Sequence, residues 1–207
     1  MSRLQRTPPA GGAHLDELER ALAALRPEAP RIERWGRRLA AVLAAGGRLL
    51  AAGNGGSAAQ AAHLTSELVG RYRHDRPPFS AIALCAEPSA VTAIGNDYGL
   101  EAVFARQVCG HGRTGDVLVA LSTSGRSANV LTAVEAANAL GLVTWGLCGQ
   151  PGSPLAEACD EALCVDSPHT ATVQEVHLVA IHLLCAAVDC TLAAGAQLAT
   201  ADAGAPA

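Results

Sequence analysis

Short apolar runs alternate with longer helical segments from residue 46 onward, and this alternation constrains the fold more than any other feature of the chain. Five runs are expected to be strands: Arg48–Ala52, Ser80–Cys85, Asp116–Leu121, Val143–Cys148 and Ala162–Val165. The segments around them are expected to be helices: Ser57–Val69, Ser89–Ile94, Leu100–Cys109, Ser127–Ala139, Leu155–Ala158 and Val173–Ala194. Strands that alternate with helices form a parallel sheet covered on both faces. The sequence therefore predicts an α/β protein, a three-layer αβα sandwich around a five-stranded parallel sheet.

Two more helices are predicted before the sheet. Residues 13–26 and 31–45 carry apolar side chains at helical spacing, and Pro27 and Pro30 separate the two segments. Their apolar faces need a partner surface.

The 207 residues suit one domain of ordinary size. We expect it to span residues 13–194, with N-terminal helices over 13–45 and the α/β core over 46–194. The two ends, residues 1–12 and 195–207, are expected to be disordered.

The chain contains no lysine, because all fifteen of its basic residues are arginines. A Walker-type phosphate loop needs a lysine to reach the β- and γ-phosphates, and Schiff-base catalysis needs a lysine amine. Both chemistries are therefore excluded. Sugar or carbonyl chemistry in this protein must use carboxylate, imidazole or a metal.

Charge and composition argue against nucleic acid as a partner. The formal net charge is −4 and aromatic residues make up 3% of the chain, whereas a nucleic-acid binder usually carries a basic stripe. Residues 1–12 contain charges and prolines but no apolar signal core, so we expect a cytoplasmic protein without a membrane partner. Seven cysteines without a Cys-x-x-Cys pair are expected to be buried, reduced thiols: Cys85, Cys109, Cys148, Cys159, Cys164, Cys185 and Cys190.

A glycine-rich turn follows the first predicted strand, with the sequence Gly53-Asn54-Gly55-Gly56-Ser57. Glycines permit a left-handed or closely approached backbone, and the start of the following helix presents free N–H groups to an anion. Alone, the turn could equally be a tight strand-to-helix connection. A dinucleotide fingerprint would need a third glycine where Ala58 stands.

A serine-rich loop lies between the third strand and its helix, with the sequence Ser122-Thr123-Ser124-Gly125-Arg126-Ser127. Hydroxyls and backbone amides at a helix N-terminus can surround a phosphate monoester without a lysine. The alternative is a simple serine-rich turn. Both this loop and the glycine turn follow the carboxyl ends of parallel strands, where ligands bind in open α/β sheets.

His63 and Glu67 are four residues apart, so they project from one face of the helix that the glycine turn begins. Such a pair can bind zinc or act as an acid and a base, although many pairs of this kind are only surface contacts.

The segment Gln174 to His182 adds polar groups to the last helix. On a regular helix these two residues lie about 12 Å apart along the axis, too far to bind one ion readily. Either the helix start is bent or two subunits contribute. His177 is a competing ligand, or else has a structural role.

With these residues in view, the chain resembles the sugar isomerase (SIS) domain family, and within it the phosphoheptose isomerases, from about residue 30 to 192. Five blocks match that pattern in order and spacing: Gly-Asn-Gly-Gly-Ser-Ala-Ala with His63, Glu67-Leu-Val-Gly-Arg71, Ala93-Ile-Gly-Asn96-Asp97, Ser122-Thr-Ser-Gly-x-Ser127, and Gln174-Glu-x-His-x4-His182.

The resemblance implies a flavodoxin-like SIS fold and an aldose–ketose isomerase. The expected reaction converts D-sedoheptulose 7-phosphate into D-glycero-D-manno-heptose 7-phosphate through an enediol, toward nucleotide-activated heptose. It also implies one zinc ion per subunit and a homotetramer with active sites at subunit contacts.

The site residues implied by the resemblance fall into three groups. The zinc ligands would be His63, Glu67, Gln174 and His182, with Glu67 and His182 also the catalytic pair. The phosphate would be held by Ser122, Thr123, Ser124 and Ser127. The rest of the substrate would contact Asn54, Gly55, Gly56, Ser57, Arg71, Asn96, Asp97 and Gln174. A carboxylate suits removal of a carbon-bound proton, so Glu67 is expected to be the base and His182 the acid, with the reverse assignment also open.

A non-catalytic SIS protein, of the replication initiator-associating type, is the main alternative. The presence of both Glu67 and His182 favours catalysis. A third hypothesis is an amino-sugar phosphate isomerase or etherase of the same fold.

Overall fold

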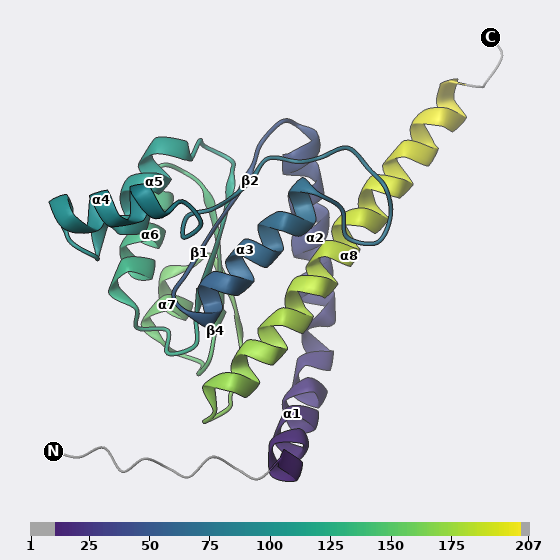
Figure 1. Cartoon of the computed structure of the whole chain (residues 1–207). Coiled ribbons are helices and arrows are strands. Elements are labelled where there is room, and N and C mark those ends of the chain that lie inside the picture. Colours follow the sequence, from purple (N-terminus) through teal and green to yellow (C-terminus); the bar gives the residue numbers. More distant parts are fainter. Residues whose placement is uncertain (1–10, 204–207) are drawn as a thin grey trace, which may run out of the picture.

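A five-stranded parallel sheet forms the centre of the protein (Figure 1). The structure, a computed structural model, describes residues 11–203, with side chains as far as Gly195. The strand order is β2-β1-β3-β4-β5, and every neighbouring pair is parallel. The strands are β1 (Leu49–Gly53), β2 (Ala81–Ala83), β3 (Val117–Ser122), β4 (Val143–Cys148) and β5 (Glu161–Cys164). The predicted α/β class and five-stranded parallel sheet are confirmed.

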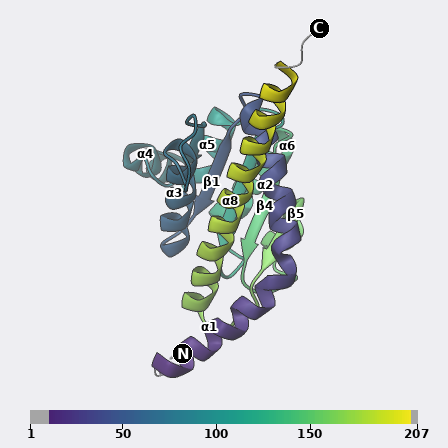
Figure 2. The ribbon, with the colours of Figure 1, turned by 90° about the vertical axis from the view of Figure 1, so that its right-hand side faces the viewer.

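Helices cover both faces of this sheet, as Figures 1 and 2 show. One face is covered by α1 (Gly11–Leu25), α2 (Ala29–Ala44), α3 (Gly56–Val69) and α8 (Thr170–Ala203), with a short 3-10 turn, η1 (Arg26–Glu28), between α1 and α2. The other face is covered by α4 (Pro88–Tyr98), α5 (Ala102–His111), α6 (Ala128–Ala139) and α7 (Pro154–Ala158). The two predicted N-terminal helices find their partner surface on α8 and the sheet.

The central strands are apolar on both sides because both sides are buried. In β3, Val117, Val119 and Leu121 pack against the α2–α3–α8 layer. Leu118 and Ala120 point to the opposite layer. This explains why the strands are continuous apolar runs in the sequence.

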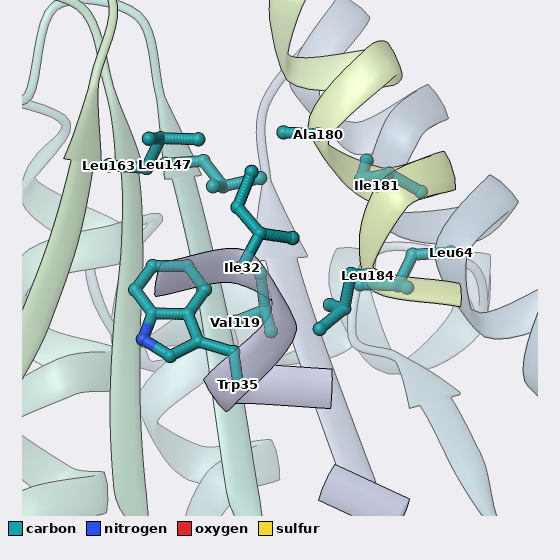
Figure 3. A pocket seen from close by; sticks show the side chains of 9 residues that line it. All are labelled: Ile32, Trp35, Leu64, Val119, Leu147, Leu163, Ala180, Ile181 and Leu184. Carbon is teal, nitrogen blue, oxygen red and sulfur yellow. The ribbon is translucent and has the colours of Figure 1, made fainter. Parts of the chain in front are cut away.

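Two large aromatic side chains, Trp35 and Trp145, are buried between α2 and the sheet. The rings of Trp35 and Trp145 stack with centroids 4.9 Å apart and planes within 3°. Beside them is a small apolar pocket between α2, α3, α8 and the sheet (Figure 3), lined by Ile32, Trp35, Leu64, Val119, Leu147, Leu163, Ala180, Ile181 and Leu184. These side chains hold α3 and α8 on the same face of the sheet.

The last helix is longer than predicted. α8 continues to Ala203, so residues 195–203 are helical rather than disordered. This stretch is rich in alanine and contains no proline, both of which favour continuation of a helix. At the other end, Gly11 and Gly12 already belong to α1. The predictions of disorder for residues 1–10 and 204–207 lie outside the described residues.

Most of the other boundaries differ from prediction by a few residues, whereas β4 begins and ends as predicted. The largest change is α4, which begins after Glu87, whose carboxylate accepts the N–H of Ser89 at 3.1 Å and also that of Ala90. It ends at Tyr98, and Gly99 follows with φ +88°. β2 is only three residues long.

By length and composition, the Thr170–Gly195 part of α8 could cross a membrane, and one third of its apolar window is buried in the protein. However, α8 packs along α1, α2 and α3. A core helix passes the same test of hydropathy, so this segment is no argument for a membrane protein.

Candidate active site

Close packing explains the glycines in the turn after β1. A Cβ at Gly53 would lie 2.8 Å from the carbonyl oxygen of Ser57, and one at Gly56 would lie 2.5 Å from the side-chain amide nitrogen of Gln174. Gly55 has φ +54°, which favours glycine. The turn therefore lets the first residues of α3 contact the start of α8.

The serine loop gathers hydroxyl groups at the start of α6. The Oγ atom of Ser122 lies 3.0 Å from that of Ser127 and 3.3 Å from that of Ser124. Gly125 turns the chain with φ +62°, and its N–H donates to the carbonyl oxygen of Ser122 at 3.0 Å. Ser127 is the residue before α6, so the hydroxyls converge on a helix N-terminus, where an anion is favoured.

A cleft of about 310 Å³ adjoins this loop. Its lining comes from the serine loop, from the segment after β4, from the segment between β5 and α8, and from the start of α8: Thr123, Ser124, Arg126, Gln150, Ser167, Pro168, Thr170 and Val173. Sequence reasoning did not assign Arg126, Gln150, Ser167 or Thr170 to the site. Only Arg126 carried a signal, since it is the one cation inside the serine motif.

The two turns are also linked to each other. The side-chain amides of Asn54 and Asn129 exchange two hydrogen bonds, of 2.8 and 2.9 Å. Asn54 belongs to the glycine turn and Asn129 to the first turn of α6. This pair keeps the glycine turn next to the serine loop.

The predicted acid, base and metal ligands meet between α3 and α8. The Nε2 atoms of His63 and His182 are 3.0 Å apart, and Nε2 of His63 lies 3.4 Å from a carboxylate oxygen of Glu67. One ligand atom from each of the three lies within 4.8 Å of the others. The tertiary structure thus brings together residues 119 positions apart in the sequence.

The groups of this cluster remain accessible. The side chain of His63 is 38% exposed and that of Glu67 is 18% exposed. The ring of Tyr72 stacks on that of His182, with centroids 5.6 Å apart. Tyr72 was not predicted from the sequence, because it follows the end of α3 in an irregular segment and carries no motif signal.

The donor set fits a zinc ion. Zinc bonds imidazole nitrogen and carboxylate oxygen at about 2.0–2.2 Å, and in a tetrahedral site these donors are separated by about 3.3 Å. The separations of 3.0 and 3.4 Å in this cluster are close to that value. His63, Glu67 and His182 could therefore hold a metal with at least one position left open.

Gln174 lies apart from the other three predicted ligands. Its amide packs over Gly56, seven residues before His63, and thus about 10 Å away along α3. α8 is one unbroken helix from Thr170 through His182. A single chain therefore brings together three of the four predicted zinc ligands.

His177 is a core residue. It is fully buried, and its Nε2 atom lies 3.0 Å from the carbonyl oxygen of Cys148 at the end of β4. Burial lowers the pKa of His177 to about 4, so the imidazole is neutral. Of the two roles that the sequence left open for His177, the structure shows the structural one. His177 therefore does not compete for the metal.

Three predicted sugar-binding residues lie on the exposed surface of the chain. Arg71 donates a hydrogen bond to the carbonyl oxygen of Arg73 at 3.3 Å. Asn96 donates to a carboxylate oxygen of Asp97 at 2.8 Å, at the end of α4. Among the described residues, no hydrogen bond joins these side chains to the cluster or to the serine loop, and their role stays a prediction.

The cysteines are free thiols, in part as predicted. Cys148, Cys159 and Cys185 are buried, whereas Cys109 and Cys190 are exposed and so correct the expectation of burial. Both exposed thiols lie on helix faces that this single chain leaves uncovered.

Comparison with known proteins agrees with this geometry. The SIS domain family matches residues 13–149. The phosphoheptose isomerase of Streptomyces coelicolor is 64% identical over 188 residues, which is 91% of this chain and 81% of that protein. The phosphoheptose isomerase of Thiobacillus denitrificans is 51% identical, over 79% of this chain and 85% of that protein.

Solved structures give the same result. The phosphoheptose isomerase of Neisseria gonorrhoeae has a TM-score of 0.79 at 40% identity, covering 86% of this chain and 96% of that one. The phosphoheptose isomerase from Francisella tularensis has a TM-score of 0.81 at 34% identity, over 86% of this chain and 95% of that one.

Proposed function

Since the chain belongs to the SIS domain family, we propose that it catalyses the reaction of the phosphoheptose isomerases that it resembles. It is an aldose–ketose isomerase that converts D-sedoheptulose 7-phosphate into D-glycero-D-manno-heptose 7-phosphate, for nucleotide-heptose biosynthesis. The single observation that carries the proposal is the juxtaposition of Glu67 and His182, within 4.8 Å of each other and accessible to a ligand.

The reaction requires two kinds of proton transfer. A proton leaves C1 and returns at C2 through an enediol, while protons also move between O1 and O2. The Glu67 carboxylate takes the carbon-bound proton and returns it at the neighbouring carbon, as a general base and then a general acid. The His182 imidazole moves the proton between the two oxygens, and the stacked ring of Tyr72 keeps it oriented.

The serine loop supplies the affinity for the phosphate. Ser122, Thr123, Ser124 and Ser127 donate hydroxyl or backbone hydrogen bonds at the start of α6, where the helix dipole favours negative charge. Arg126, which lines the same cleft, adds the positive charge that a lysine would otherwise supply.

The metal ligands would be His63, Glu67 and His182, with the fourth position left to Gln174 of another copy, to substrate or to water. When bound, a zinc ion supplies a Lewis acid that polarises carbonyl and hydroxyl oxygens. Equilibrium dialysis with zinc, in the parent and in His63→Ala, tests the site without depending on turnover.

The spacing of the two halves of the site supports a homotetramer with active sites at subunit contacts. Glu67 lies eleven residues after Gly56, about 16 Å along α3, whereas the serine loop lies next to the glycine turn. An extended chain gains about 1.2 Å per bond, so C1 and phosphorus of the substrate are at most about 10 Å apart. This spacing supports the proposal that the serine loop that serves one Glu67 comes from a second copy.

An apolar groove between α2 and α8 offers a surface for that second copy. It has a volume of about 500 Å³ and is lined by Ala29, Glu33, Arg37, Leu183, Ala186, Ala187, Cys190, Thr191 and Ala194. Leu183 is 39% exposed in the single chain. Covering this face with another copy would bury Leu183, which follows His182 on α8.

Complementation tests the shared site. Glu67→Gln and Ser124→Ala chains are expected to be inactive or weak alone, and mixed oligomers of the two should regain part of the parent activity, because some sites pair an intact base with an intact loop. No recovery in mixed oligomers would place both halves of the site in one chain.

We further expect a soluble, cytoplasmic enzyme with a sugar phosphate as its ligand. NMR-monitored incubation with sedoheptulose 7-phosphate, with and without a chelator, tests the function. A new aldose signal supports it. Binding without turnover would support the non-catalytic alternative. Turnover of a hexosamine or N-acetylmuramate 6-phosphate would support the hypothesis of an amino-sugar phosphate isomerase or etherase.

A further inference from the structure

A buried arginine connects the two helices that carry the acid and the base. Arg76 lies in the segment between α3 and β2, and its Nε atom donates to a carboxylate oxygen of Asp189 on α8 at 2.9 Å. Its other nitrogens donate to the carbonyl oxygens of Glu67 at 2.6 Å and of Leu68 at 2.9 Å. The side chains of Arg76 and Asp189 are 8% and 7% exposed.

The contacts with Glu67 and Leu68 are contacts with a helix end. The last carbonyl groups of a helix have no partner within the helix, and a cation near them is favoured by the helix dipole. α3 ends at Val69, so Arg76 satisfies carbonyl groups in its final turn. The arginine therefore fixes the backbone of Glu67 itself, not only the surrounding loop.

The contact with Asp189 fixes the same turn against α8. Asp189 lies seven residues after His182, two helical turns away on the same face. Cys185 lies between them, and its pKa is raised to about 12 by burial and by the nearby carboxylates of Glu67 and Asp189. His182, Cys185 and Asp189 thus form one stripe of α8 that faces the end of α3.

Stability alone does not account for this arrangement. A buried ion pair can often be replaced by apolar side chains of similar size without loss of stability, because both charges must be desolvated. Apolar side chains, however, cannot donate hydrogen bonds to the carbonyl groups of Glu67 and Leu68. Arg76 therefore fixes the position of the final turn of α3 relative to α8, which apolar packing would not do.

We infer that Arg76 and Asp189 are positioning residues for the isomerisation: they hold the final turn of α3 against α8, so that the Glu67 carboxylate faces the substrate carbon beside His182. This inference rests on the proposed function. Neither residue touches the substrate, so their loss should lower kcat and leave KM nearly unchanged.

The chain offers a matched control. Asp116 is another buried carboxylate, with its side chain 4% exposed, and it pairs with Arg48 at 3.4 Å. It immediately precedes β3 and also accepts the backbone N–H groups of Arg48 and Arg113, so none of its partners belongs to α3 or α8. Asp116→Asn and Asp189→Asn should both lower the melting temperature, because each removes a buried carboxylate that pairs with an arginine, partly exposed Arg48 or buried Arg76.

Only Asp189→Asn should impair catalysis. A displacement of about 1 Å at the reacting groups can cost about a hundredfold in rate, so kcat should fall by about two orders of magnitude. Asp116→Asn should keep the kcat of the parent at a temperature where both variants are folded by circular dichroism. If Asp189→Asn keeps the parent kcat, or if both variants lose it equally, the positioning role is overturned.

A double variant separates stability from position. Arg76→Met with Asp189→Leu should regain part of the melting temperature lost in Asp189→Asn, because no unpaired charge stays buried, while kcat stays about a hundredfold low. Recovery of kcat together with stability would overturn the inference. If Asp189→Asn does not fold, Arg76→Lys replaces it, because a lysine keeps the charge but not the planar fork that reaches Asp189, Glu67 and Leu68 together. A parent enzyme without isomerase turnover would instead overturn the proposed function, and this inference with it.

Discussion

Replacing Glu67 by glutamine tests the assignment of the base most directly. Glutamine has nearly the same size and shape, but it cannot accept a proton from carbon. General base catalysis contributes about 10²- to 10⁴-fold in rate, so kcat should fall by that factor, equivalent to about 3–5 kcal/mol in the barrier.

The structure predicts that this variant folds and still binds the phosphate of the substrate. The side-chain contact that is lost is one partly exposed pair with His63, at 3.4 Å. Such pairs contribute about 0–1 kcal/mol, so the melting temperature should change by only a few degrees. The hydrogen bond from Arg76 goes to the backbone of Glu67 and is kept. KM should also change little, because the serine loop that binds the phosphate is untouched.

Two measurements in heavy water check this prediction. NMR follows the appearance of the aldose, and it also follows exchange of the C1 proton of the ketose with solvent, which reports the action of the base alone. Glu28→Gln is the control, since Glu28 is a partly exposed carboxylate that pairs with Arg31 and not with a residue of the cluster. If Glu67→Gln exchanges the C1 proton at the parent rate while His182→Asn does not, the roles of acid and base are reversed.

Three further predictions test other parts of the site. His63→Ala should lower zinc affinity by at least tenfold in a competition titration, because it removes one of three clustered ligands. Gly125→Ala should raise KM and the inhibition constant of inorganic phosphate roughly tenfold. A Cβ at φ +62° costs about 1–2 kcal/mol, and it would lie 2.2 Å from the hydroxyl oxygen of Ser153. Unchanged constants would exclude the loop as the phosphate site. The His177 imidazole binds a proton below about pH 6.5 in the unfolded chain but only below about pH 4 in the folded chain. The free energy of unfolding therefore decreases as pH falls between these two values, by up to about 3 kcal/mol. Chemical denaturation across this range should therefore show a shallower loss of stability in His177→Phe than in the parent.

Local patterns were sufficient to predict the sheet and most of its helices. Apolar runs buried on both faces of a parallel sheet need no knowledge of their partners, and the strand Val143–Cys148 was predicted to the residue. The pairing of His63 with Glu67 also follows from one helical turn. The extension of α8 to Ala203 was missed because a small, polar composition was taken for disorder, although the same residues favour a helix once one has begun.

Local patterns could not predict which side chains of two different helices come into contact. The sequence alone determined which groups this protein can use: carboxylate, imidazole and serine hydroxyls, in the absence of any lysine. Only the tertiary structure decided that His182 meets His63 while Gln174 packs over Gly56, because α3 and α8 lie side by side on one face of the sheet. Distances between helices depend on packing over the whole core, and Arg76 carries no motif signal that would reveal its contact with both.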